Sequence, residues 1–268
     1  QEGLPVWKCG EGKPLVLLVD LRHGAFSFRY LLGPLAKKFS ITLADPLSPG
    51  LGEGEVVSGI EDLALLVERR VGNLAADGAI WVAHGESALA ALWLGLNGRV
   101  TQRALVAISP FRVRRSLLGL AARLRSREKK RDQVAEKLFE DPTASAAAML
   151  DYTDPAVFSR QEIRWLASRH VLMPAAKAIA SLLIDLSGKA FAESCRQFLS
   201  SLSGGTGAYP CPLKLVCGAK SERQVTDFSR TLQRSLAGAE LYLPECGPVV
   251  QVENPAALIE VIEACAAG

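Results

Sequence analysis

The sequence predicts an α/β protein with a doubly wound, mostly parallel sheet and an inserted helical cap. Short apolar runs, bounded by glycine, proline or aspartate, alternate with amphipathic helical patterns, and this alternation is typical of parallel sheets covered by helices. Between about residues 110 and 209 only helical patterns occur. We therefore expect an α/β core formed by residues 1–110 and 208–268, and a helical cap formed by residues 111–207.

Six apolar runs have the length and composition of strands that are buried on both faces of a parallel sheet. They cover residues 15–19, 41–44, 79–83, 104–108, 213–216 and 241–243.

Three helix starts are marked by side chains that can accept hydrogen bonds from the N–H groups of a first turn. Ser58 with Glu61, and Ser221 with Gln224, have the spacing of capping boxes. Asn254 precedes Pro255, which is typical of an N-cap followed by the first helical position. Within the cap we expect five helices, at residues 117–124, 132–139, 161–167, 175–186 and 191–202.

The composition excludes several classes of protein. The 268 residues are 49% hydrophobic and 22% charged, which indicates a packed core. The net charge of +3 does not indicate nucleic-acid binding, and no apolar run reaches the roughly 18 residues of a transmembrane segment. The six cysteines have neither disulfide density nor metal-ligand spacing, so we expect reduced thiols in a cytoplasmic protein without a metal or other cofactor.

Five segments, in matching order and spacing, resemble the α/β-hydrolase family. The first strand and the start of the first helix lie within residues 15–32, and D-P-L-S-P-G-L-G at residues 45–52 is similar to the family's D-x-P-G-x-G turn. Residues 103–109, 212–218 and 252–255 resemble the strand after the nucleophile helix, the strand before the triad acid and the segment after the triad histidine. The resemblance implies an α/β-hydrolase-like sheet with a ligand pocket at the carboxyl ends of its strands.

The same resemblance locates the positions of a Ser-His-Asp triad, where this chain carries other residues. The nucleophile position falls on Gly85, the acid position on residues 219–221 and the histidine position on Pro248. Asp20 lies in the oxyanion loop, where the family needs N–H donors that stabilise a negative oxygen. The resemblance therefore implies a divergent member of the family that lacks the triad.

Ser87 is an alternative nucleophile, because G-E-S-A at residues 85–88 matches the start of a carboxylesterase elbow. In that register Leu89 would occupy a position that needs a very small side chain. An activated serine also needs a general base. The chain has three histidines and none is near its last strand: His23, His84 and His170.

Seven residues are expected to line the ligand site: Asp20, Leu21, His23, His84, Gly85, Glu86 and Pro248. Asp20, His84 and Ser87 are the candidates for catalysis. The leading interpretation is a protein that binds a small apolar ligand or has an accessory role, without triad hydrolysis. The alternatives are a lyase, decarboxylase or cyclase that uses an imidazole and a carboxylate, and a weak esterase that uses Ser87.

Residues 112–131 are strongly basic, with Glu128 as their single acid. Such a segment can bind an acidic protein or an anionic ligand, or it can form a solvated helix whose apolar side packs on the body of the protein. The sequence leaves both alternatives open.

Overall fold

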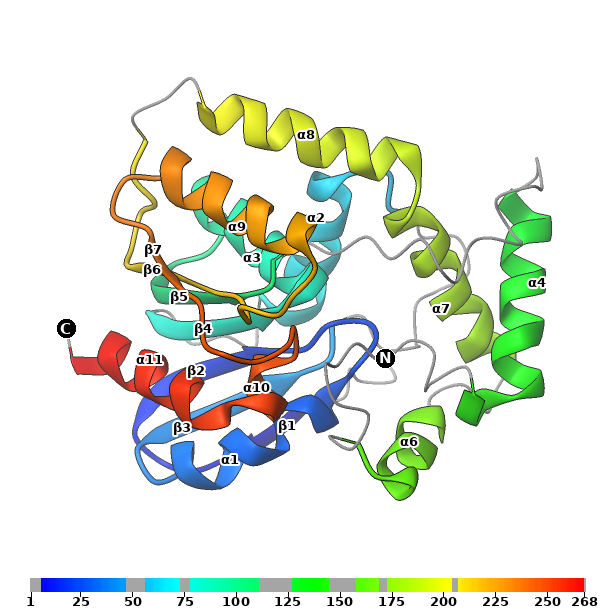
Figure 1. Ribbon diagram of the computed structural model, residues 1–268, viewed down its shortest axis with the longest axis horizontal. Coiled ribbons are helices and arrows are strands. Elements are labelled where there is room, and N and C mark those ends of the chain that lie inside the picture. Colours follow the sequence, from blue (N-terminus) through cyan, green and yellow to red (C-terminus); the bar gives the residue numbers. More distant parts are fainter. Residues whose placement is uncertain are drawn as a thin grey trace.

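The computed structural model describes residues 6–46, 56–72, 78–110, 127–144, 158–168, 173–203 and 207–267. In these residues seven strands form one sheet in the order β1-β3-β2-β4-β5-β6-β7 (Figure 1). All neighbouring strands are parallel except β1 and β3. The strands are β1 (Val6–Cys9), β2 (Lys13–Leu18), β3 (Phe39–Ala44), β4 (Ala79–His84), β5 (Gln102–Ile108), β6 (Leu213–Val216) and β7 (Glu240–Tyr242).

The six predicted strands are confirmed as β2 to β7, and β1 is an addition that the sequence analysis did not contain. β1 lies at the edge of the sheet and pairs antiparallel with β3, with Val6 opposite Ala44. None of its four residues is fully buried. An edge strand of this kind lacks the continuous apolar run by which the buried strands were recognised.

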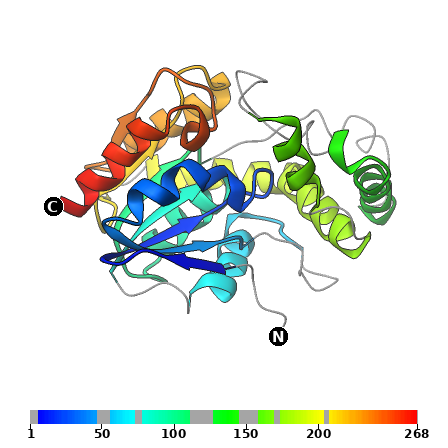
Figure 2. The same ribbon diagram turned by 90° about the horizontal axis from the view of Figure 1, so that it is seen from below.

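Helices cover both faces of the sheet (Figures 1 and 2). Val16 and Leu18 of β2 pack in the core cluster that includes buried residues of the helices on one face, while Leu15 and Leu17 pack with those on the other. This division follows from the alternation of side chains along a strand. The first face carries α2 (Ile60–Val71), α3 (Gly85–Leu96), α8 (Lys189–Ser203) and α9 (Arg223–Ser235), and the second carries η1 (Ala25–Phe28), α1 (Arg29–Leu35), α10 (Val250–Glu253) and α11 (Pro255–Ala267).

Both predicted capping boxes are wrong, because the N-cap residue is Gly59 at α2 and Glu222 at α9, and neither makes a side-chain capping hydrogen bond. At α2 the Ile60 N–H donates instead to Ser194 Oγ of the distant helix α8, at 3.0 Å. At α9 the buried Ser221 Oγ has no hydrogen-bond partner among the described residues. The predicted cap at Asn254 is confirmed, since its Oδ1 accepts from the Ala257 N–H at 3.3 Å.

Four of the five helices expected between residues 111 and 207 are present, and the fifth, at residues 117–124, lies outside the described residues. They are α4 (Arg127–Glu140), α6 (Arg160–Ala167), α7 (Met173–Leu186) and α8. In both views α4, α6 and α7 lie to one side of the sheet, whereas α8 lies over α2 and α9 (Figures 1 and 2). The division of the chain at residues 111 and 207 stays a prediction.

Among the residues that the structure describes, no helix has the length and apolar character needed to cross a membrane.

Candidate functional site

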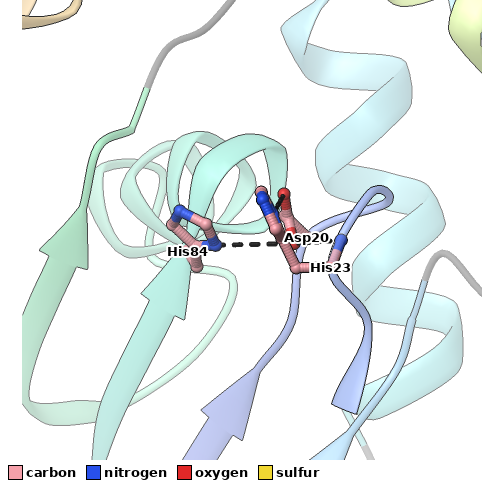
Figure 3. Close-up of side chains that lie close together, drawn as sticks. All are labelled: Asp20, His23 and His84. Carbon is pink, nitrogen blue, oxygen red and sulfur yellow. Dashed lines mark hydrogen bonds and ion pairs between the residues drawn. The ribbon is translucent and has the colours of Figure 1, made fainter. Parts of the chain in front are cut away.

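Three buried polar side chains meet at the carboxyl ends of two neighbouring parallel strands. Asp20 follows β2 by two residues, His23 lies three residues further on, and His84 ends β4. Their exposed fractions are 0%, 1% and 3%. Ligands of open α/β sheets bind at this edge, so we call Asp20, His23 and His84 the polar cluster (Figure 3).

The Asp20 carboxylate lies between the two imidazoles of the polar cluster (Figure 3). His23 Nδ1 is 2.7 Å from Asp20 Oδ2, and the His23 backbone N–H donates to Asp20 Oδ1 at 3.0 Å. His84 Nδ1 is 3.4 Å from Asp20 Oδ1. The two ring centroids are 5.3 Å apart, so one carboxylate contacts both rings.

Burial and charge determine the protonation of the cluster. Burial by itself raises the pKa of Asp20, but interactions with His23 and His84 outweigh it and hold the pKa well below the usual value of 3.8. For His23, burial is the largest influence, and together with the charges of His84 and Arg22 it holds the pKa below 6.5 although Asp20 raises it. At neutral pH the site therefore holds an ionised carboxylate beside a neutral His23.

These two pKa values predict that the protein loses stability in acid, when a chelator keeps it free of metal ions. Unfolding restores the higher, ordinary pKa values of both groups, so the unfolded chain binds more protons. The free energy of unfolding therefore decreases as the pH is lowered. The His23 contribution decreases below about pH 6.5 and the Asp20 contribution below about pH 3.8. We expect urea denaturation to show that, just below pH 6.5, the free energy of unfolding decreases less for His23→Gln than for the unsubstituted protein. An equal decrease in both proteins would contradict the assignment to His23.

A buried ion pair lies beside the polar cluster. Arg22 Nη2 donates to Glu86 Oε1 at 3.0 Å, and Arg22 Nε is 3.7 Å from Asp20 Oδ2. The Arg22 and Glu86 side chains are only 6% and 9% exposed. The sequence analysis selected Glu86 but missed Arg22, although Arg22 stands between the two selected residues Leu21 and His23. Leu21 itself packs in the apolar core.

Gln251 of α10 also reaches the polar cluster. Its side chain is fully buried and its Nε2 lies 3.0 Å from His84 Nδ1. Its Oε1 has no hydrogen-bond partner among the described residues. Gln251 is distant from His84 in sequence and belongs to no motif, so only the tertiary structure identifies it.

Gly85 is the first residue of α3, directly after β4. Its φ of 58° lies in the left-handed region that side chains disfavour. A Cβ atom on Gly85 would lie 2.9 Å from the Asp20 Cβ. The backbone and the neighbouring side chain therefore both require glycine at this strand-to-helix turn.

Ser87 and Pro248 are held by other contacts. Ser87 is fully buried, and its Oγ donates to the Val19 carbonyl at 2.6 Å. Pro248 is buried, and its carbonyl accepts from Ser109 Oγ at 3.2 Å. The structure thus joins Asp20, His23, His84 and Glu86 through direct contacts or through Arg22, and it shows no hydrogen bond from Ser87 or Pro248 to them. His170 lies outside the described residues.

Aromatic side chains cover His23 on the side of α6. Phe158 stacks on the His23 ring with centroids 6.5 Å apart. The Arg29 guanidinium lies over the rings of Phe26 and Phe158 and pairs with Glu162 of α6 at 2.9 Å. The Arg29–Glu162 pair connects α6 to the start of α1, while Phe158 packs on the His23 ring.

No protein-family model matches the chain, and no curated protein matches it in sequence. Several solved structures are similar to the chain in fold. The epoxide hydrolase CorEH has a TM-score of 0.70 at 16% identity, covering 98% of this chain and 94% of its own. A hydrolase from Pseudomonas aeruginosa PA01 has a TM-score of 0.68 at 16% identity, covering 98% and 94%. A thermophilic esterase from Thermogutta terrifontis has a TM-score of 0.65 at 15% identity, covering 97% and 92%. The chain therefore has the α/β-hydrolase fold.

Proposed function

We propose that this chain is a catalytically divergent protein of the α/β-hydrolase fold that does not hydrolyse substrates through a Ser-His-Asp triad. Gly85 carries the proposal, because it stands at the strand-to-helix turn and has no nucleophile. The histidine position assigned from the family resemblance holds Pro248, and the acid position holds Ala219, Lys220 and Ser221. A protein that keeps the fold can lose or exchange its chemistry, because function resides in the site.

The contacts of Ser87 argue against its use as a substitute nucleophile. Its hydroxyl is fully buried and already donates to the Val19 carbonyl. A nucleophilic serine needs a base within hydrogen-bond reach of its oxygen, and the nearby imidazoles of His23 and His84 contact Asp20 instead.

In this proposal the polar cluster is the recognition element of a ligand site. A small, mainly apolar ligand with one polar group suits a buried carboxylate and two imidazoles, because most of a small-molecule site is apolar and a few polar groups orient the ligand. The basic residues 112–131 are proposed to meet an acidic protein or an anionic ligand. Residues 112–126 of that segment lie outside the described residues.

The second candidate is a lyase, decarboxylase or cyclase, and the Asp20–His23 pair favours it. A carboxylate that accepts from Nδ1–H orients an imidazole and leaves Nε2 as the basic nitrogen. A neutral imidazole held in this way is a suitable general base near neutral pH.

Labelling with a fluorophosphonate tests the proposed function. We expect no covalent adduct at Ser87, because its oxygen is buried, donates a hydrogen bond to the Val19 carbonyl, and has no base in hydrogen-bond reach among the residues that the structure describes. Intact-mass and peptide mass spectrometry would detect an adduct, with an active serine esterase as the positive control. Labelling that disappears in Ser87→Ala would overturn the proposal and support the weak esterase. Mass spectrometry of molecules that co-purify with the protein would then identify the class of ligand.

A further inference from the structure

The polar cluster has the donor atoms of a metal site. One ligand atom from each of Asp20, His23 and His84 can be chosen so that all three lie within 4.8 Å of one another. With metal–ligand bonds of about 2.0–2.2 Å, adjacent ligand atoms are about 2.9–3.5 Å apart. His23 Nδ1 lies 2.7 Å from Asp20 Oδ2 and His84 Nδ1 lies 3.4 Å from Asp20 Oδ1, so each imidazole nitrogen is near one oxygen of the same carboxylate.

Gln251 supplies a second and independent observation. Its amide reaches the polar cluster through Nε2, 3.0 Å from His84 Nδ1, and its fully buried Oε1 has no hydrogen-bond partner among the described residues. An unsatisfied buried polar atom costs about 1–3 kcal/mol. In the structure Nε2 faces the cluster and Oε1 faces away from it. Rotation of the amide by half a turn would direct Oε1 at the cluster, where it could bind a cation, and would place Nε2 where Oε1 now lies.

The charges around the cluster are compatible with a cation. Arg22 is a positive group that contacts the cluster, and its Nη2 lies 3.0 Å from Glu86 Oε1 while its Nε lies 3.7 Å from Asp20 Oδ2. Since Arg22 makes its shorter contact with Glu86, these two charges largely compensate each other. The Asp20 carboxylate is then the net negative charge of the site.

We propose that Asp20, His23 and His84 bind one divalent transition-metal ion, with the Gln251 side-chain oxygen as a fourth ligand. Two imidazoles and a carboxylate suit Zn²⁺, Co²⁺, Ni²⁺ or Fe²⁺, whereas Mg²⁺ and Ca²⁺ prefer oxygen ligands alone. This inference deepens the proposed function and rests on it, because the same residues replace triad chemistry at this edge of the sheet. A Lewis acid at this position would provide an electrophile next to the turn where Gly85 has no nucleophile.

Titration of chelator-treated, dialysed protein with Zn²⁺ tests the proposal by calorimetry. We expect about one equivalent to bind per chain. His84→Gln should weaken binding at least about tenfold, because even the loss of an outer-shell partner costs 10–100-fold in metal affinity. Titration with Co²⁺ gives a second readout, since its visible absorption reports nitrogen and oxygen ligands directly.

Two matched variants separate this site from adventitious binding. Cys9→Ser removes an exposed thiol, and His170→Gln removes the third histidine of the chain; both should bind Zn²⁺ like the unsubstituted protein. Gln251→Leu should weaken binding while the other three ligands remain. Circular dichroism establishes that each variant is folded.

The inference is overturned if the unsubstituted protein binds no stoichiometric Zn²⁺, if His84→Gln binds as tightly, or if Cys9→Ser or His170→Gln abolishes binding. Failure of the metal site is distinguishable from failure of the proposed function. If the protein binds no Zn²⁺ and Ser87 is not labelled by the fluorophosphonate, only the metal site is rejected. If Ser87 is labelled, the proposed function is rejected.

Discussion

Replacing Gly85 by alanine is expected to lower the free energy of unfolding by roughly 2–5 kcal/mol. Part of the loss comes from the φ of 58°, since a Cβ in the left-handed region costs roughly 1–2 kcal/mol. The remainder comes from the 2.9 Å contact between the new Cβ and the Asp20 Cβ, because overpacking typically costs about 1–3 kcal/mol. Urea denaturation of Gly85→Ala and of the unsubstituted protein measures the sum.

Gly98→Ala is the matched control for the backbone. Gly98 has a similar φ of 64°, but no atom lies within 4 Å of a Cβ built on it. We expect Gly98→Ala to lose only the backbone part, roughly 1–2 kcal/mol. Equal losses for the two variants would show that the Asp20 contact is unimportant.

A double-mutant cycle isolates the contact itself. Asp20→Gly removes the Cβ that the new methyl group would meet, so Gly85→Ala should cost less in an Asp20→Gly background than alone. Additive losses would contradict this explanation. If it holds, Gly85→Ser by itself cannot restore an esterase, because Asp20 and a nucleophile at residue 85 compete for the same space.

Replacing Arg22 by methionine is expected to lower the free energy of unfolding by roughly 3–5 kcal/mol, the usual cost of removing one partner of a buried ion pair. The physical reason is the charge left behind: Glu86 would lose its 3.0 Å contact with Arg22, and its Oε2 already has no hydrogen-bond partner among the described residues. Thermal and urea denaturation of Arg22→Met measure the loss.

The double variant Arg22→Met with Glu86→Leu should recover much of this loss, because it removes both buried charges and keeps apolar volume. An exposed arginine–glutamate pair is available as a control: Arg99 and Glu68 are 2.8 Å apart, with the Arg99 side chain 48% exposed. Arg99→Met should lose much less stability than Arg22→Met, since water solvates the remaining glutamate. A double variant as unstable as Arg22→Met would show that the arginine stabilises the site by packing rather than by charge.

Local patterns were sufficient for the parts of the fold that depend on local physics. The runs buried on both faces predicted β2 to β7, and the Asn254-Pro255 pair predicted the start of α11. The capping boxes failed because each helix begins one residue later than its serine predicts, with Gly59 and Glu222 as the N-cap residues. At α2 the Ile60 N–H instead donates to Ser194, a residue 134 positions away in the chain. β1 was missed since an exposed edge strand has no strong hydrophobic pattern.

The sequence by itself determined the α/β class and the order of the strands along the chain, and it located glycine at the turn after β4. Apolar periodicity and the length of each run are local properties, so they can be read without coordinates. Only the tertiary structure decided which polar groups meet. Asp20, His84 and Gln251 come from three separate segments and lie together because β2 and β4 are neighbours and α10 packs against the same edge. The close approach of Asp20 to Gly85 has the same origin, since burial and distance between segments are set by packing and leave no signal in either segment alone.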